Sequence, residues 1–185
     1  NFANRSSTKW LRYDADVLPM HVAEMDFEVA KPIRDKISEM ALNSDLGYLG
    51  IFPGIGPAFA SFAKRRWGWE ADPKGIKLAT DVGVAAVEIL KSVTQPGDRV
   101  LINSPVYAAF FGWIKEAECV PFDAPLQLDG ETWRLDLSAI RAAFDQGVKV
   151  FLLCSPHNPI GRILTARELT EIAMLAKEID VLVIS

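Results

Sequence analysis

The feature that most constrains the fold of this chain is the regular alternation of short apolar runs with amphipathic segments from Ile76 onward. The apolar runs that we expect to be strands are Ile76–Ala79, Arg99–Ile102, Glu118–Phe122, Val148–Cys154 and Val181–Ser185. Helical spacing falls between them, at Gly83–Val93, Val106–Ala117, Ser138–Phe144 and Thr165–Glu178. Strands that alternate with helices form βαβ units, so the sequence predicts an α/β fold with a mostly parallel sheet and helices on both faces.

The first 68 residues follow a different pattern. The stretch up to about Val29 has few periodic signals and is expected to be an extended arm. Apolar residues at helical spacing predict helices at Lys31–Leu42 and Ile55–Trp67, joined by a loop at 47–54 that is rich in glycine and aromatic residues. We therefore expect an arm with two helices at 1–68, followed by the α/β domain at 69–185.

Composition excludes several classes of protein. A net charge of −4 over 185 residues offers no basic footprint for nucleic acid. No apolar run approaches the roughly 20 residues that span a bilayer, and the first residues lack the apolar core of a signal peptide. Cys119 and Cys154 are too few and too far apart for a disulfide-rich secreted fold. We expect a cytoplasmic protein that contacts neither nucleic acid nor membrane.

Metal and nucleotide signatures are missing from the sequence. His21 and His157 are too few and too far apart to predict a zinc site, and the acidic residues near the start do not have the spacing of a calcium loop. Neither GxGxxG nor GxxxxGK followed by Ser or Thr occurs, which argues against a nicotinamide cofactor and against a P-loop nucleotide. No metal is expected.

Ligands of a doubly wound sheet bind beyond the carboxyl ends of its strands, so the residues that follow each strand are the candidates for a site. After the first predicted strand, a turn formed by Val82, Gly83, Val84 and Ala85 begins a helix whose backbone N–H groups could hold a phosphate. A plain strand-to-helix turn fits the same pattern. After the next strand, Tyr107 could stack on a flat heterocycle, or pack in the core or a dimer interface.

A rigid polar loop follows the fourth predicted strand. Two prolines and a glycine in Ser155–Arg162 bracket a polar pair, and the Asn158 side-chain amide could donate a hydrogen bond to a ligand oxygen. We expect a cis peptide bond before Pro159. No neighbouring carboxylate in the sequence orients His157, which we predict to be structural rather than a catalytic base.

These segments occur together and in order, and the combination resembles the class I and II aminotransferases of fold type I. Ser155–Arg162 resembles the asparagine-loop motif of that family. Ser7–Trp10 and Leu18–Phe27 resemble, more narrowly, its cystathionine β-lyase or C–S lyase branch, known as the MalY/PatB type. Gly47-Tyr48 and Ser104–Tyr107 fit the same branch, and the resemblance covers essentially all 185 residues.

The resemblance implies pyridoxal 5′-phosphate (PLP) as cofactor and gives roles to the matching positions. The turn at 82–85 would hold the cofactor phosphate, Tyr107 would stack on the pyridine ring, and Asn158 would hydrogen-bond the phenolic oxygen. Tyr48 would reach across a homodimer interface toward the neighbour's cofactor phosphate. Ala23 and Glu24 would border the amino-acid substrate.

Three positions depart from the family pattern. His21 stands where an aromatic residue is common, Glu24 where Asp is usual, and Ile160 where Thr is usual. These departures leave the expected fold intact and loosen the expectation about the substrate.

The resemblance also implies groups that this sequence does not provide. The aspartate that pairs with the pyridine nitrogen, the Schiff-base lysine and the substrate-carboxylate arginine would all follow Ser185. Lys91, Lys149 and Lys177 match no Schiff-base position. We therefore expect the N-terminal portion of an enzyme, with an incomplete large domain and no activity by itself.

The activity that the resemblance implies is C–S β-lysis of an amino acid, which gives pyruvate, ammonia and a thiol. Transamination within the same family is the alternative. A hypothesis of a different class is a non-catalytic α/β domain that binds a partner or a phosphate ligand. A Rossmann oxidoreductase is disfavoured because the glycine fingerprint is missing.

Overall fold

The computed structural model describes residues 4–48, 50 and 54–185. The chain divides into two compact units, 1–73 and 74–185. Leu49 and residues 51–53 of the loop expected at 47–54 lie outside the described residues. The domain boundary expected after residue 68 stays a prediction.

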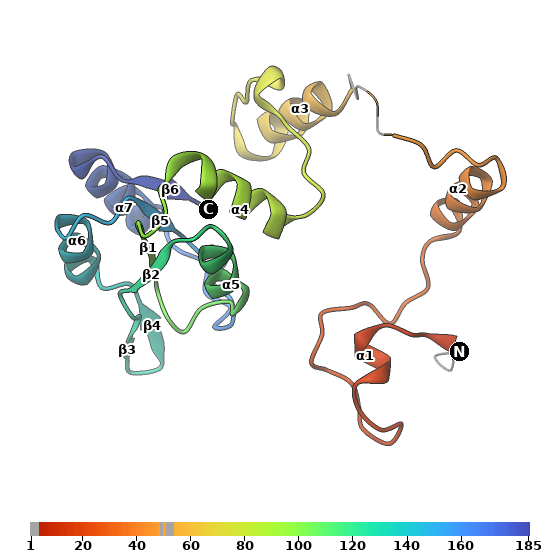
Figure 1. Cartoon of the computed structure of the whole chain (residues 1–185), viewed down its shortest axis with the longest axis horizontal. Coiled ribbons are helices and arrows are strands. Elements are labelled where there is room, and N and C mark those ends of the chain that lie inside the picture. The colour runs from red at the N-terminus through yellow and green to blue at the C-terminus, as the bar shows by residue number, and fades with distance from the viewer. Residues whose placement is uncertain (1–3, 49, 51–53) are drawn as a thin grey trace. The chain divides into compact units, whose positions relative to one another are not determined.

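The second unit is built on a parallel sheet. Strand β1 (Arg99–Ile102) pairs with β2 (Val120–Asp123) on one side and β5 (Val150–Leu152) on the other, and β5 pairs with β6 (Leu182–Ile184). The strand order is therefore β2-β1-β5-β6 (Figure 1). All four strands are parallel, so the loops that follow β1, β2 and β5 leave the sheet at one edge, where β6 also ends.

Alternate residues of the inner strands face two separate apolar clusters. Leu101 and Phe151 pack with helices α6 (Leu137–Asp145) and α7 (Ala166–Ile179). Val100, Ile102, Val150 and Leu152 pack with α4 (Val82–Val93) and α5 (Ala109–Glu116) on the other face. Figure 1 shows these helix pairs on opposite sides of the sheet. The predicted α/β fold with helices on both faces is confirmed.

Two predicted elements of this unit need correction. The strand expected at Ile76–Ala79 is wrong: the segment pairs with no strand among the described residues, and the Leu78 side chain is 55% exposed. A mainly apolar segment of four residues does not form a strand unless a neighbouring strand accepts and donates its backbone hydrogen bonds. The helix expected from Val106 begins only at Ala109: Val106 and Tyr107 have no regular secondary structure, and Ala108 is the N-cap. The loop between β2 and α6 contains a short antiparallel hairpin formed by β3 (Gln127–Asp129) and β4 (Thr132–Arg134).

The first unit contains three α-helices among its described residues. A short helix α1 (Thr8–Leu11), absent from the sequence prediction, lies within the expected arm. Helices α2 (Lys31–Leu42) and α3 (Ile55–Trp67) have the predicted bounds. Helix α3 ends at Gly68, whose φ of 66° is a conformation that glycine adopts at little cost. A 3-10 turn follows at Pro73–Gly75.

The apolar face of α2 is not packed in a hydrophobic core. None of its residues is buried, and Ile33 and Ile37 are 54% and 60% exposed. In α3, by contrast, Ala63 is fully buried, while Phe59 contacts the rings of Trp67 and Trp69. Periodicity therefore predicts the helix correctly in both cases, and inward packing in only one.

Helix α7 begins with a capping box. The Thr165 hydroxyl accepts a hydrogen bond from the Glu168 N–H, and the Glu168 carboxylate accepts one from the Thr165 N–H at 2.9 Å. Two helix-end donors that have no partner within the helix are thereby satisfied.

Replacing Thr165 with Ala should destabilise the second unit by about 1 kcal/mol, because one of these donors loses its acceptor. Chemical denaturation followed by circular dichroism measures the change. Thr170→Ala is the matched control, since Thr170 lies inside the same helix and its hydroxyl bonds the Ala166 carbonyl. Equal effects of the two substitutions would contradict a specific role for the cap.

Candidate active site

A cavity of about 740 Å³ lies at the sheet edge where β5 and β6 end. Its walls come from the start of α4, from α5 with the loop before it, and from the ends of the two strands. The lining residues are Asp81, Val82, Gly83, Ala85, Ala86, Ile89, Tyr107, Ala109, Phe110, Trp113, Leu152, Leu153, Ile184 and Ser185. Of the predicted site residues, Val82, Gly83, Ala85 and Tyr107 line this cavity, whereas Val84 and Asn158 do not.

The N-terminus of α4 offers fewer free donors than its sequence predicts. The Asp81 side chain caps the helix by accepting a hydrogen bond from the Val84 N–H at 2.9 Å. The Ala85 N–H donates to the Asp81 carbonyl at 3.1 Å. Within the described part of the chain, the N–H groups of Val82 and Gly83 have no acceptor. An anion at this helix end would therefore meet two free peptide donors and the positive end of the helix dipole.

A cluster of aromatic rings forms one wall of the cavity. The Tyr107 ring meets those of Phe110 and Trp113 at centroid distances of 6.3 and 5.9 Å, and Phe110 lies 5.2 Å from Trp113. Tyr107 is 45% exposed, so part of its ring is free to contact a ligand.

Sequence reasoning missed Trp113. It touches the start of α4 closely: a Cβ atom on Gly83 would lie only 2.8 Å from the Trp113 Nε1. The spacing of Tyr107, Phe110 and Trp113, three residues apart, is the signal that could have revealed the cluster.

The loop after β5 is tied to the loop after β1 by a buried histidine. The His157 Nε2 lies 2.9 Å from the Pro105 carbonyl oxygen, and the residue is only 2% exposed. A carbonyl only accepts, so Nε2 carries the proton; Nδ1 is buried with no partner among the described residues. This position agrees with the structural role predicted for His157, which joins the loops that bear Tyr107 and Asn158.

Internal hydrogen bonds hold the asparagine loop in shape. The Asn158 N–H donates to the Cys154 Sγ, the Gly161 N–H to the His157 carbonyl, and the His157 N–H to the Arg162 carbonyl. The cis peptide bond predicted before Pro159 is confirmed. The Asn158 side chain is exposed and has no hydrogen-bond partner in the described part of the chain, so its amide is free for a ligand.

An ion pair joins the end of this loop to α7. The Arg162 Nη2 lies 2.6 Å from the Glu168 Oε1, and these side chains are 16% and 19% exposed. Burial by itself would raise the pKa of Glu168. Hydrogen bonds from the Thr165 N–H, from Arg162 and from the Thr165 hydroxyl outweigh that effect and hold the pKa below its ordinary value of 4.5.

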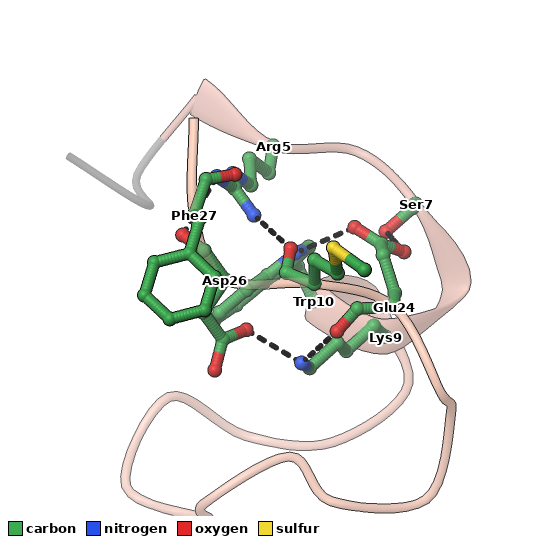
Figure 2. A network of polar contacts seen from close by, with 8 residues as sticks. Arg5, Ser7, Lys9, Trp10, Glu24, Asp26 and Phe27 are labelled. Carbon is green, nitrogen blue, oxygen red and sulfur yellow. Dashed lines mark hydrogen bonds and ion pairs between the residues drawn. The ribbon is translucent and has the colours of Figure 1, made fainter. Parts of the chain in front are cut away.

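In the first unit, α1 is hydrogen-bonded to the segment at 24–27 (Figure 2). The buried Lys9 ammonium donates to the Glu24 carbonyl at 2.6 Å and pairs with the Asp26 carboxylate at 2.5 Å. The guanidinium of Arg5 donates to the backbone carbonyls of residues 25–27 and lies over the Trp10 ring. These contacts fix the segment that carries the predicted substrate residues.

Both oxygens of the Glu24 carboxylate are already engaged. One accepts a hydrogen bond from the Ser7 hydroxyl at 2.5 Å and the other from the Trp10 indole at 3.1 Å. The Ser7 hydrogen bond is the main reason that the pKa of Glu24 lies below its ordinary value. Ala23 and Tyr48, also in this unit, are exposed.

The described residues contain no group of three or more His, Cys, Asp or Glu placed to hold a metal ion. No helix among them is long and apolar enough to cross a membrane.

Residues 16–185 match the family model of class I and II aminotransferases. The chain belongs to that family, as its motifs predicted. A cystathionine beta-lyase of Corynebacterium glutamicum is 31% identical over 173 residues, which cover 92% of this chain and 45% of that protein. An aspartate aminotransferase of Pyrococcus abyssi is 30% identical over 174 residues, with 92% and 44% covered.

The same likeness appears among solved structures. Cystalysin from Treponema denticola, whose crystal structure contains a PLP cofactor, is 27% identical and has a TM-score of 0.87. The match covers 99% of this chain and 48% of cystalysin. The chain thus spans about half the length of the relatives it matches.

Replacing His157 with Phe should cost about 1–3 kcal/mol of stability, because the Pro105 carbonyl loses its buried donor. Urea denaturation measures the loss. The control is His21→Phe, since His21 is exposed and should change stability by less than about 0.5 kcal/mol. Equal stability of the two variants would show that the hydrogen bond between His157 and Pro105 contributes nothing to the free energy of unfolding.

Replacing Glu168 with Gln should lower stability at neutral pH by about 1–3 kcal/mol, since charge-assisted hydrogen bonds are lost. The folded-state pKa of Glu168 is depressed, so its contribution is fully present above pH 4.5. That contribution disappears as the pH falls through the folded-state pKa. Denaturation curves of both proteins between pH 7 and pH 3 should therefore converge in acid; a constant difference would contradict the assignment.

Proposed function

We propose that this chain is the cofactor-binding part of a PLP-dependent C–S lyase, which converts an amino acid with a sulfur leaving group to pyruvate, ammonia and a thiol. The observation that carries the proposal is one cavity in which two free peptide N–H groups of α4 and the face of Tyr107 lie together. The sequence likeness to a cystathionine beta-lyase supports the choice of reaction.

The donor set at α4 fits the phosphate of PLP. Val82 and Gly83 would bind phosphate oxygens through their peptide N–H groups, while Val84 and Ala85 shape the turn without a free donor. Tyr107 would stack on the pyridine ring, and its neighbours Phe110 and Trp113 keep that side of the cavity apolar. When bound, the cofactor supplies the electron sink for the carbanion that precedes loss of the thiolate.

Asn158 would donate its free amide hydrogen to the phenolic oxygen of the cofactor. His157 keeps the loop of Asn158 against the loop of Tyr107, so ring stacking and this hydrogen bond would be set together. The requirement for a Schiff-base lysine is not met by the matching positions of this sequence, so a further segment would provide that group.

The partners are an amino-acid substrate and a second copy of the chain. Tyr48 has an exposed side chain and would reach the phosphate bound by the partner subunit. On the substrate side, the Glu24 carboxylate is engaged by Ser7 and Trp10, so Ala23 and the backbone of this segment would border the substrate. We place the enzyme in the cytoplasm, because its cysteines are free and buried.

Two other functions compete with this proposal. The likeness to an aspartate aminotransferase favours transamination as the alternative reaction. The N–H groups of Val82 and Gly83, which have no acceptor among the described residues, also fit a non-catalytic domain that binds a phosphate ligand, the alternative of a different class.

The whole gene product, loaded with PLP, should release pyruvate from L-cystathionine much faster than free PLP does. A coupled lactate dehydrogenase assay measures pyruvate, and a thiol reagent measures homocysteine in the same sample. Tyr107→Leu should weaken PLP binding by about twofold to about tenfold, since ring stacking contributes about 0.5–1.5 kcal/mol.

Phe111→Leu is the matched control, because Phe111 neighbours the cavity wall in sequence without lining the cavity. If the protein exchanged amino and keto acids without releasing pyruvate, the reaction would be transamination rather than C–S lysis. Specific PLP binding with neither reaction would favour the non-catalytic domain.

A further inference from the structure

We propose that Trp113 is a further cofactor-binding residue, whose indole Nε1–H is a third donor to the anionic group held at the start of α4. This inference rests on the proposed function and adds to it a residue that neither the motifs nor the family likeness identified.

The location of the indole nitrogen is the first reason. Trp113 lines the cavity, and its Nε1 lies 2.8 Å from the point that a Cβ on Gly83 would occupy. Gly83 carries one of the two free N–H groups of the helix end. Any larger residue at 83 would push the indole away, so the glycine permits the close approach of the two donors.

The lack of an acceptor for this donor is the second reason. An indole N–H can only donate. Trp113 is partly buried, its ring lies against those of Tyr107 and Phe110, and no acceptor for its N–H is found in the described part of the chain. The N–H is therefore available to a ligand in the cavity.

The charge of the cavity is the third reason. Its lining residues include the Asp81 carboxylate, and none of those that the structure describes is Lys or Arg. The Asp81 Oδ1 lies 3.1 Å from the same point above Gly83, and this carboxylate would repel a phosphate. An anion here depends on neutral donors, and a third such donor offsets part of the repulsion.

Equilibrium dialysis of the chain with pyridoxine 5′-phosphate and with pyridoxine tests this inference. Neither ligand has an aldehyde, so neither forms Schiff bases with surface lysines. The variant is Trp113→Phe, which keeps an aromatic ring and removes the N–H. The control is Trp133→Phe, the same change in the β3–β4 hairpin away from the cavity.

The expected result is about tenfold weaker binding of pyridoxine 5′-phosphate by Trp113→Phe, as for loss of a hydrogen bond to a charged group, with pyridoxine binding unchanged. The Trp133→Phe control should bind both ligands like the wild type. Equal weakening for both ligands would mean that the indole only packs on the ring, and no weakening would mean that it contributes nothing; either overturns the inference.

If the wild type bound neither ligand, the proposed cofactor cavity itself would be wrong, and the inference with it. Should Trp113→Phe fail to fold, NMR of the wild-type indole groups replaces it. The Trp113 Nε1–H resonance should then move on addition of pyridoxine 5′-phosphate and stay in place with pyridoxine; an unmoved resonance would overturn the inference.

Discussion

The site depends on the parallel pairing of β1 with β5. Because these inner strands run the same way, the chain leaves both at one edge of the sheet, and the loops that bear Tyr107 and Asn158 begin side by side. The hydrogen bond from His157 to the Pro105 carbonyl then fixes one loop on the other. His157, which the sequence predicted to be structural, thus connects two loops whose bonded residues lie 52 positions apart in the chain.

What the N-terminus of α4 can bind depends on which of its peptide N–H groups already have an acceptor. Four consecutive residues look equivalent in the sequence, but a helix satisfies its own donors from the fourth residue onward, and Asp81 takes one more. Among the residues that the structure describes, the N–H groups of Val82 and Gly83 are left without an acceptor. Asp81 has opposite effects, since its capping bond stabilises α4 while its charge opposes an anion. Under the proposed function, neutral donors close to the helix end, rather than basic side chains of the cavity lining, would bind the phosphate.

The sequence predicted most of the second unit because both faces of its sheet are covered. Apolar runs such as Val150–Leu152 and the capping box at Thr165 are local signals that packing reinforces. The strand predicted at Ile76–Ala79 was wrong because a strand needs a neighbouring strand to pair with, and sequence periodicity does not show whether one is present. The sequence did not predict Trp113 as a site residue, because its role depends on a contact with Gly83. The two residues lie thirty positions apart, in helices α5 and α4. The contacts of Glu24 with Ser7 and Trp10 are equally non-local, so a residue expected at the substrate also holds α1 in place.

A crystal structure of the chain with bound pyridoxine 5′-phosphate would locate the phosphate and the ring. We expect phosphate oxygens within hydrogen-bond distance of the Val82 and Gly83 nitrogens, with the pyridine ring against Tyr107. A phosphate bound elsewhere, at a ligand concentration that saturates the chain in solution, would contradict the assignment of this cavity to the cofactor.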